Sequence, residues 1–123
     1  MLKLLNDVIN YYTPSPGYIY TLHNEIFKFY GEHVYKCGNS SDVDKRLNNY
    51  TTSYPKPSKI VMLSEIFYDK NFAETLLFYY LKDYKMELDR EFFNCDINII
   101  QDAFYKVNEF FINSFSENTP VFL

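Results

Sequence analysis

The sequence contains no tryptophan, and its 123 residues include only three glycines and five prolines. Collagen-like chains and flexible, low-complexity linkers need far more glycine and proline, so both classes are excluded. No apolar run approaches the roughly 18 residues that a membrane-spanning helix requires. Aromatic residues, by contrast, are abundant at 20%, and 47% of the chain is hydrophobic. This size and composition predict a single domain, residues 1–123, with a sizeable core.

Cysteine is also scarce. Cys37 and Cys95 form no CxxC pair, which favours reduced intracellular thiols over a disulfide framework. The first residues carry charge at Lys3 and Asp7, too early for the apolar part of a secretory signal. We therefore expect a soluble, intracellular protein without a membrane partner.

The sequence also lacks an excess of positive charge, since the net charge is −4. This argues against a basic surface that covers the whole molecule. The distribution is uneven, because residues 1–60 carry seven basic and five acidic side chains and residues 61–123 carry five and eleven. An anion-binding face is expected in the first half.

The spacing of hydrophobic residues predicts the secondary structure. Helical periodicity predicts helices over residues 2–12, 42–50, 71–84 and 96–115, and alternation or short apolar runs predict strands over 18–22, 34–37 and 59–67, with 60–63 buried. Ser40, Ser41 and Asp42 are candidate N-caps for the second helix, and Asn71 with Glu74 fits a capping box for the third. The predicted fold class is α+β, a small three-stranded antiparallel or mixed sheet flanked by helices.

Three residues stand out chemically. Gly38 either lets a backbone approach closely at an anion-binding helix start or simply makes the turn from strand to helix. Arg46 lies on the apolar stripe of its helix, so an inward guanidinium needs a structural carboxylate, a route to solvent or a substrate phosphate. Glu74 is either the capping partner of Asn71 or an oxygen ligand for a divalent cation, because one carboxylate cannot serve mainly as both.

Taken in chain order, these features resemble the GIY-YIG endonuclease superfamily, in particular its phage and large-DNA-virus branch, whose second triplet often reads Lys-Ile-Gly. The resemblance covers residues 16–95, followed by a C-terminal helix over 96–115 that packs on this core. The matching pieces are Gly17-Tyr18-Ile19-Tyr20, Tyr35-Lys36-Cys37-Gly38, Arg46, the Ala73-Glu74 pair and Glu91-Phe92-Phe93.

The resemblance implies a metal-dependent endonuclease acting on nucleic acid, with DNA the expected substrate. It implies that Tyr20 lies in the active-site sheet, that Arg46 contacts the scissile phosphate and that Glu74 binds a single Mg²⁺ or Mn²⁺. The metal polarises the phosphate while the arginine offsets the charge that develops during hydrolysis.

Two motif positions differ from the family. Lys36 fills the position of the second tyrosine, and Tyr35 falls on the opposite strand face. Lys36 is then either a base with a shifted pKa or a cation that binds phosphate. In the second case, Tyr20 or a metal-bound water carries out the proton transfer. Asn94 is a candidate for a late active-site asparagine.

Further contacts to nucleic acid are expected from Tyr35, Lys45, Lys56 and Lys59. Tyr18, Tyr20, Tyr50 and Tyr54 either stack on bases or pack in the core. The carboxylates at positions 87, 89 and 91 are interpreted as a solvated cluster. Phe110, Phe111 and Phe115 either seal the core or form a homodimer interface.

Two alternatives remain at this stage. The chain could be a catalytically degenerate module that binds nucleic acid or a protein without cleavage, given Lys36 and the acidic balance. A purely structural α+β domain would make the ordered motifs accidental, and we place it last.

Overall fold

The structure is a computed structural model, and it describes residues 14–87 and 91–114. The elements, in chain order, are β1 (Tyr18–Asn24), the 3-10 helix η1 (Glu25–Tyr30), β2 (Val34–Ser40), α2 (Val43–Ser53), β3 (Ser58–Leu63), α3 (Lys70–Tyr80), the short 3-10 helix η2 (Lys82–Tyr84), β4 (Phe92–Asn94) and α4 (Ile97–Ser114). The helix expected over residues 2–12 lies outside the described residues.

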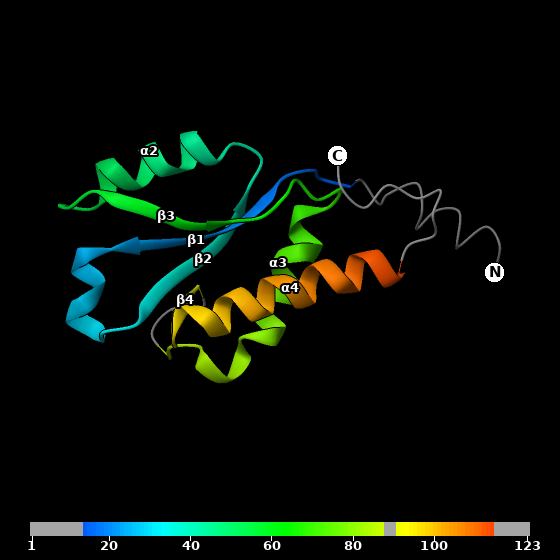
Figure 1. Cartoon of the computed structure of the whole chain (residues 1–123). Helices are drawn as coiled ribbons and strands as arrows, with labels where there is room; N and C mark the ends of the chain where they lie inside the picture. The colour runs from blue at the N-terminus through cyan, green and yellow to red at the C-terminus, as the bar shows by residue number, and fades with distance from the viewer. Residues whose placement is uncertain (1–13, 88–90, 115–123) are drawn as a thin grey trace.

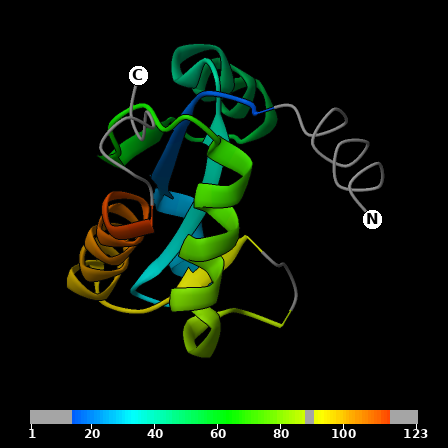
Figure 2. The same ribbon diagram turned by 90° about the vertical axis from the view of Figure 1, so that its right-hand side faces the viewer.

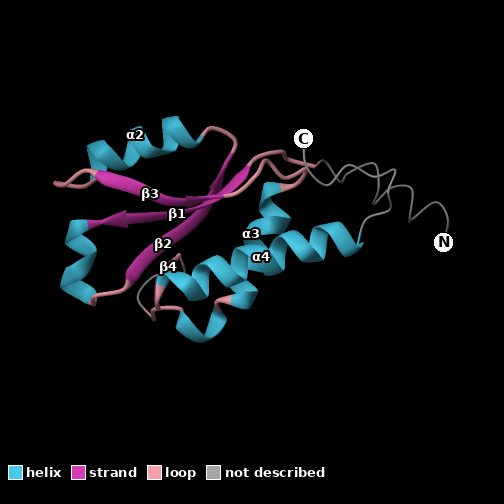
Figure 3. Ribbon diagram, viewed as in Figure 1, coloured by secondary structure: helices cyan, strands magenta, loops and turns pink. Residues whose placement is uncertain are grey.

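The four strands form one antiparallel sheet in the order β3-β1-β2-β4 (Figure 3). The predicted α+β class with flanking helices is confirmed, and the sheet has one strand more than expected. The additional strand, β4, is three residues long, too short to show a period of its own in the sequence. It extends the sheet beside β2, where Lys36 is opposite Phe92.

Helices cover both faces of the sheet, with α2 on one side and α3 and α4 together on the other (Figures 1 and 2). Alternate residues of β1 serve the two faces, as strand geometry requires. Ile19 packs into the larger cluster with α3 and α4, whereas Tyr20 and Leu22 pack into the smaller cluster with Leu47 and Tyr50 of α2. The α2 face therefore presents a tyrosine hydroxyl to a helix that has no fully buried residue.

The expectation of a buried strand over residues 60–63 is wrong. β3 is an edge strand, and Leu63 is 50% exposed. A register shift between Thr21 and Leu22 of β1 accompanies this pairing. Ile60 consequently packs on the α2 side and Met62 on the α3 and α4 side. The apolar run is therefore divided between the two faces of the sheet and does not form a buried strand.

Of the two predicted helix N-caps, one is confirmed and one is wrong. Asp42, one of the three candidates, is the N-cap of α2, and its side chain accepts a hydrogen bond from the Lys45 backbone N–H. The N-cap of α3 is Asp69, which accepts from the backbone N–H groups of Asn71 and Phe72. The predicted capping box is therefore wrong, because an aspartate two residues earlier already satisfies the free N–H groups.

The C-terminal helix closes the larger cluster. Phe111 is 1% exposed and packs on Phe67, whereas Phe110 is partly exposed. Phe115 lies outside the described residues, and a homodimer stays a prediction. Both cysteines are buried free thiols. In the part of the chain that the structure describes, no helix is long and apolar enough to cross a membrane.

Candidate active site

The candidate site lies at the Gly38 end of β2, with Tyr20 on the α2 face of the sheet and Glu74 reaching it from α3 on the opposite face. Tyr20 is opposite Gly38 in the β1–β2 ladder, and its ring lies against the glycine backbone. A Cβ atom at position 38 would be 2.7 Å from the Tyr20 hydroxyl oxygen and 3.0 Å from Cζ. Gly38 is inside β2 and has no positive φ, so its role is close approach and not a left-handed turn.

We expect Gly38→Ala to destabilise the protein by about 1–3 kcal/mol, the usual cost of overpacking, because the methyl group would displace the Tyr20 ring. Urea unfolding measures this loss. Tyr20→Phe removes the atom that clashes first, so Gly38→Ala should cost less in that background. Equal costs in both backgrounds would show that this contact is not the reason for the glycine.

Tyr20 is linked to α2 through its hydroxyl, which lies 2.9 Å from the hydroxyl of Tyr50. Burial raises the pKa of Tyr20, and the hydrogen bond and charge interaction with Tyr50 raise it further, while Arg46 opposes the shift. Tyr20 therefore keeps its proton at neutral pH. Since its side chain is only 2% exposed, Tyr20 can position Tyr50 but has little surface to offer a substrate.

Lys36 lies two residues before Gly38 on β2, so both residues are on the α2 face of the sheet. Its Nζ is 2.9 Å from a carboxylate oxygen of Glu91, 5.4 Å from the ring centre of Tyr50 and 4.9 Å from that of Phe92. Burial alone would lower the pKa of Lys36. The hydrogen bond that its ammonium group donates to Glu91 and the nearby Tyr50 outweigh burial, and the net pKa is raised. This geometry favours a role for Lys36 as a cation over a role as a base.

Glu91 is a site residue that the sequence interpretation missed. The sequence places Glu91 in a solvated cluster with two neighbouring carboxylates. Its side chain is 45% exposed, but it also pairs with Lys36. The Glu91 backbone carbonyl also accepts a hydrogen bond from the Cys37 N–H, which joins this segment to β2. Glu87 is exposed as expected, and position 89 lies outside the described residues.

Glu74 reaches the end of β2 from the other layer. Its Oε2 accepts a hydrogen bond of 2.7 Å from Nδ2 of Asn39, the residue after Gly38. Partial burial raises the pKa of the Glu74 carboxyl, with a further rise from Glu91, while Asn39 and Arg46 lower it and the net shift is upward. Because Asp69 caps α3, this carboxylate is not occupied by a capping role.

We expect the Glu74 carboxyl of the metal-free protein to titrate above an ordinary Glu, since its pKa is raised and the carboxylate is lost earlier as the pH falls. Asn39→Ala removes a hydrogen bond that lowers this pKa, so the titration should move further upward. NMR titration of the side-chain carboxyl without metal measures the shift, with the exposed Asn98→Ala as control. An unchanged titration in Asn39→Ala would contradict the role given to this hydrogen bond.

Arg46 lies in the first half of α2 and is exposed, contrary to the expectation of an inward arginine. Its stripe neighbours Val43, Leu47 and Tyr50 are only partly buried, because α2 covers the sheet loosely. The guanidinium makes no ion pair or hydrogen bond with the residues that the structure describes. Its charge nevertheless acts on both Tyr20 and Glu74, which places it within electrostatic reach of both.

The other predicted contact residues are dispersed. Lys45, Lys56 and Lys59 are exposed, the first beside Arg46 on α2 and the last on β3. Tyr35 faces the α3 and α4 side, with its ring 5.5 Å from that of His23. Asn94 is opposite Val34 at the start of β2, beside Gly31, so the structure does not bring it to the Gly38 end.

The site therefore combines the Arg46 guanidinium, the Tyr20 hydroxyl and the buried Lys36 ammonium group paired with Glu91 on the α2 face. The Glu74 carboxylate lies against Asn39 at the end of β2, on the opposite face. Within residues 14–87 and 91–114, no group of three or more His, Cys, Asp or Glu side chains could hold a metal. A zinc or calcium cage is thus not available there. Mg²⁺ fits the donor set, because it commonly binds through one carboxylate, substrate phosphate and water.

Comparison with known proteins gives one match. The family model of the T5orf172 domain matches residues 17–108, which include every element from β1 to most of α4. No curated protein and no solved structure matches the chain.

Proposed function

Because this chain belongs to the T5orf172 domain family, a nuclease-like family related to the phage GIY-YIG endonucleases, we propose that it is a metal-dependent endonuclease. It would hydrolyse phosphodiester bonds, and DNA is the proposed substrate. One observation carries the proposal: α2 and α3 both reach the Gly38 end of β2. Tyr20, opposite Gly38, contacts Tyr50 of α2, and Asn39, the residue after Gly38, donates to Glu74 of α3.

The proposal assigns phosphate binding to two cations. Arg46 is exposed and unpaired among the described residues, so its planar guanidinium can donate two parallel hydrogen bonds to a phosphate. Lys36 keeps its charge because of Glu91, and it adds a second positive group on the same face. Together they would offset the negative charge of the phosphoryl oxygens. In this reaction the oxygen of water bonds to phosphorus and loses a proton to solvent, while the bond to one sugar oxygen breaks and that oxygen takes up a proton.

Glu74 is the residue that would hold Mg²⁺. Asn39 donates to Oε2 and thereby orients the carboxylate. When bound, the metal supplies Lewis-acid polarisation of the phosphate. Tyr20 holds its proton, so its role would be to fix the hydroxyl of the half-buried Tyr50, which would hydrogen-bond to water or phosphate.

Plasmid cleavage tests the proposal. Purified protein is incubated with supercoiled plasmid, single-stranded DNA and RNA, each with Mg²⁺, with Mn²⁺ and with chelator. The proposal expects DNA to be cut with either metal and to stay intact with chelator. Failure to cut any substrate in a metal-dependent way would contradict it.

A binding module without catalysis is the second candidate. Two observations favour it: a lysine that stays protonated occupies the position of the second motif tyrosine, and the net charge is −4. Retention of DNA in a binding assay at low salt, together with no cleavage under any metal condition, would support this candidate over the enzyme.

A further inference from the structure

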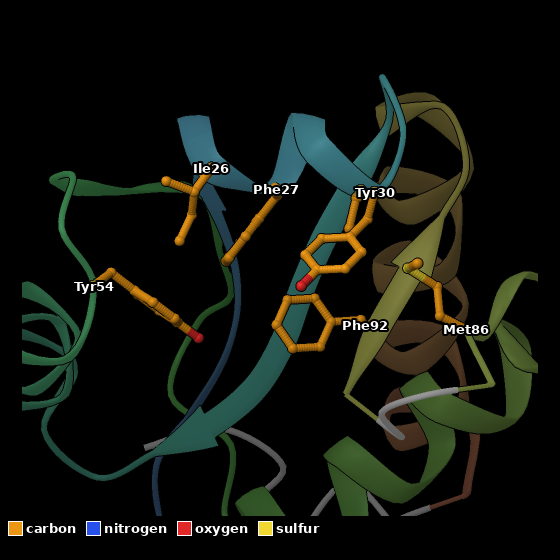
Figure 4. A pocket seen from close by; sticks show the side chains of 7 residues that line it. Ile26, Phe27, Tyr30, Tyr54, Met86 and Phe92 are labelled. Atoms are coloured by element: carbon orange, nitrogen blue, oxygen red, sulfur yellow. The ribbon is translucent and has the colours of Figure 1, made fainter.

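An apolar cavity of about 300 Å³ lies on the same sheet face as Tyr20 and Lys36, towards the start of β2. Figure 4 shows Tyr54 on one side and Tyr30, Phe92 and Met86 on the other, with η1 above. Its lining is Ile26, Phe27, Tyr30, Val34, Tyr54, Met86 and Phe92. The candidate site does not use this cavity.

The lining defines the chemistry of an occupant. None of these side chains is charged, and four of the seven carry aromatic rings. Phe27 meets the rings of Tyr54 and Phe92 edge-on, at centroid distances of 5.6 Å and 5.1 Å, which fixes both walls. The cavity volume is at the lower end of the range for small-molecule sites. It suits a flat, uncharged ring more than a charged or elongated group.

A cation adjoins this apolar cavity. Val34 lines the cavity, and Lys36 is the next residue on that strand face, about 7 Å further along β2. The Lys36 ammonium lies over Phe92, a cavity wall, and over Tyr50, whose ring stacks on Tyr54 at 5.8 Å and 13°. The ammonium is paired with Glu91, so the cavity itself defines the ligand. A flat neutral group in the cavity with an anionic group beside the Lys36–Glu91 pair matches this face, and a nucleotide has both.

The cavity is also accessible. Tyr30 is 59% exposed, and the neighbouring Phe29, with its ring 5.4 Å from that of Tyr30, is 88% exposed. Exposed aromatic rings beside an aromatic cavity are the arrangement on which unstacked bases bind in proteins that recognise single strands.

We propose that this cavity receives one unpaired nucleobase of the substrate strand, with the adjoining phosphate beside the Lys36–Glu91 pair. This inference rests on the proposed function, because it assumes a nucleic-acid substrate. It names the substrate class more narrowly, since a base inside a duplex cannot enter the cavity without being unstacked and unpaired. The protein should then prefer single-stranded or locally unpaired DNA.

The test compares two single strands with equal charge. One is an oligonucleotide of thymidines, and the other has the same number of phosphates but abasic sugars. Their dissociation constants are measured by competition in the presence of chelator, so that neither strand is cut. We expect the abasic strand to bind roughly tenfold more weakly, the scale of one base stacked on an aromatic side chain.

Two variants assign this difference to the cavity. Tyr30→Ala changes an exposed residue and should leave the fold intact, and Tyr54→Leu removes a wall while keeping bulk. Both should reduce the preference for the base-containing strand. Tyr105→Ala, an equally exposed tyrosine on α4, should keep it. Thermal melting checks that each variant is folded.

Each outcome decides between the two proposals. Equal binding of both strands by a protein that still cuts plasmid would overturn the cavity inference and leave the proposed function standing. A base preference that persists unchanged in folded Tyr30→Ala and Tyr54→Leu would also overturn it. Binding of neither strand, with no cleavage, would overturn both.

Discussion

Glu74→Gln should lower the single-turnover cleavage rate by about 10³-fold, because several kcal/mol of transition-state stabilisation depend on the metal that this carboxylate would hold. The glutamine keeps the size of the side chain and an oxygen that can accept from Asn39, so the fold should be preserved. Its neutral amide is a much weaker ligand for Mg²⁺. Rapid-quench cleavage of a labelled strand measures the rate.

Glu109→Gln is the matched control for this variant. Glu109 lies exposed on α4, and the same charge change there should leave the rate within twofold of wild type. DNA binding in chelator should be equal or slightly tighter in Glu74→Gln, because a negative charge has been removed. Cleavage by Glu74→Gln at the wild-type rate would show that another group holds the metal.

Arg46→Ala has the second-largest expected effect, a loss of about 10²- to 10³-fold in rate, the scale found when one preorganised charge stabiliser is removed. Stability should change little, since Arg46 is exposed and its guanidinium has no partner among the described residues. Arg46→Lys should recover only part of the loss, because an ammonium group cannot make two parallel hydrogen bonds to a phosphate. Single-turnover rates at saturating protein separate catalysis from binding.

Lys45→Ala provides the comparison on the same helix. Lys45 is an exposed cation next to Arg46, so its removal should weaken binding and reduce the salt dependence with little effect on the saturated rate. If Lys45→Ala and Arg46→Ala lower the saturated rate equally, Arg46 contributes only to the general charge of this surface. That result would remove it from the catalytic assignment.

The sequence predicted the parts of the fold that depend on local pattern. Alternation in the first strand, the Asp42 cap and the long C-terminal helix each have a signal within a few residues. The α3 cap was missed because Asp69 and Asn71 are both good caps, and the choice between them depends on how the chain enters the helix. β4 was missed because three residues gain strand geometry only from their pairing with β2.

The candidate site was less predictable because its contacts are long-range. Glu91 acquires its role only through the pairing of its segment with β2, which brings it to Lys36 from 55 positions away. The register that sets Tyr20 over Gly38 depends on the connection through η1, whose length does not fix the pairing. Helical periodicity placed Arg46 on an inward stripe but could not show that α2 covers the sheet loosely.

A double-mutant cycle of Glu74→Gln and Arg46→Ala in single-turnover cleavage tests the central claim most directly. If both residues act on one phosphate, their effects are coupled, and the double variant should be little slower than the slower single variant. If the two effects multiply fully, the residues act independently. That result would contradict a shared active site at the end of β2.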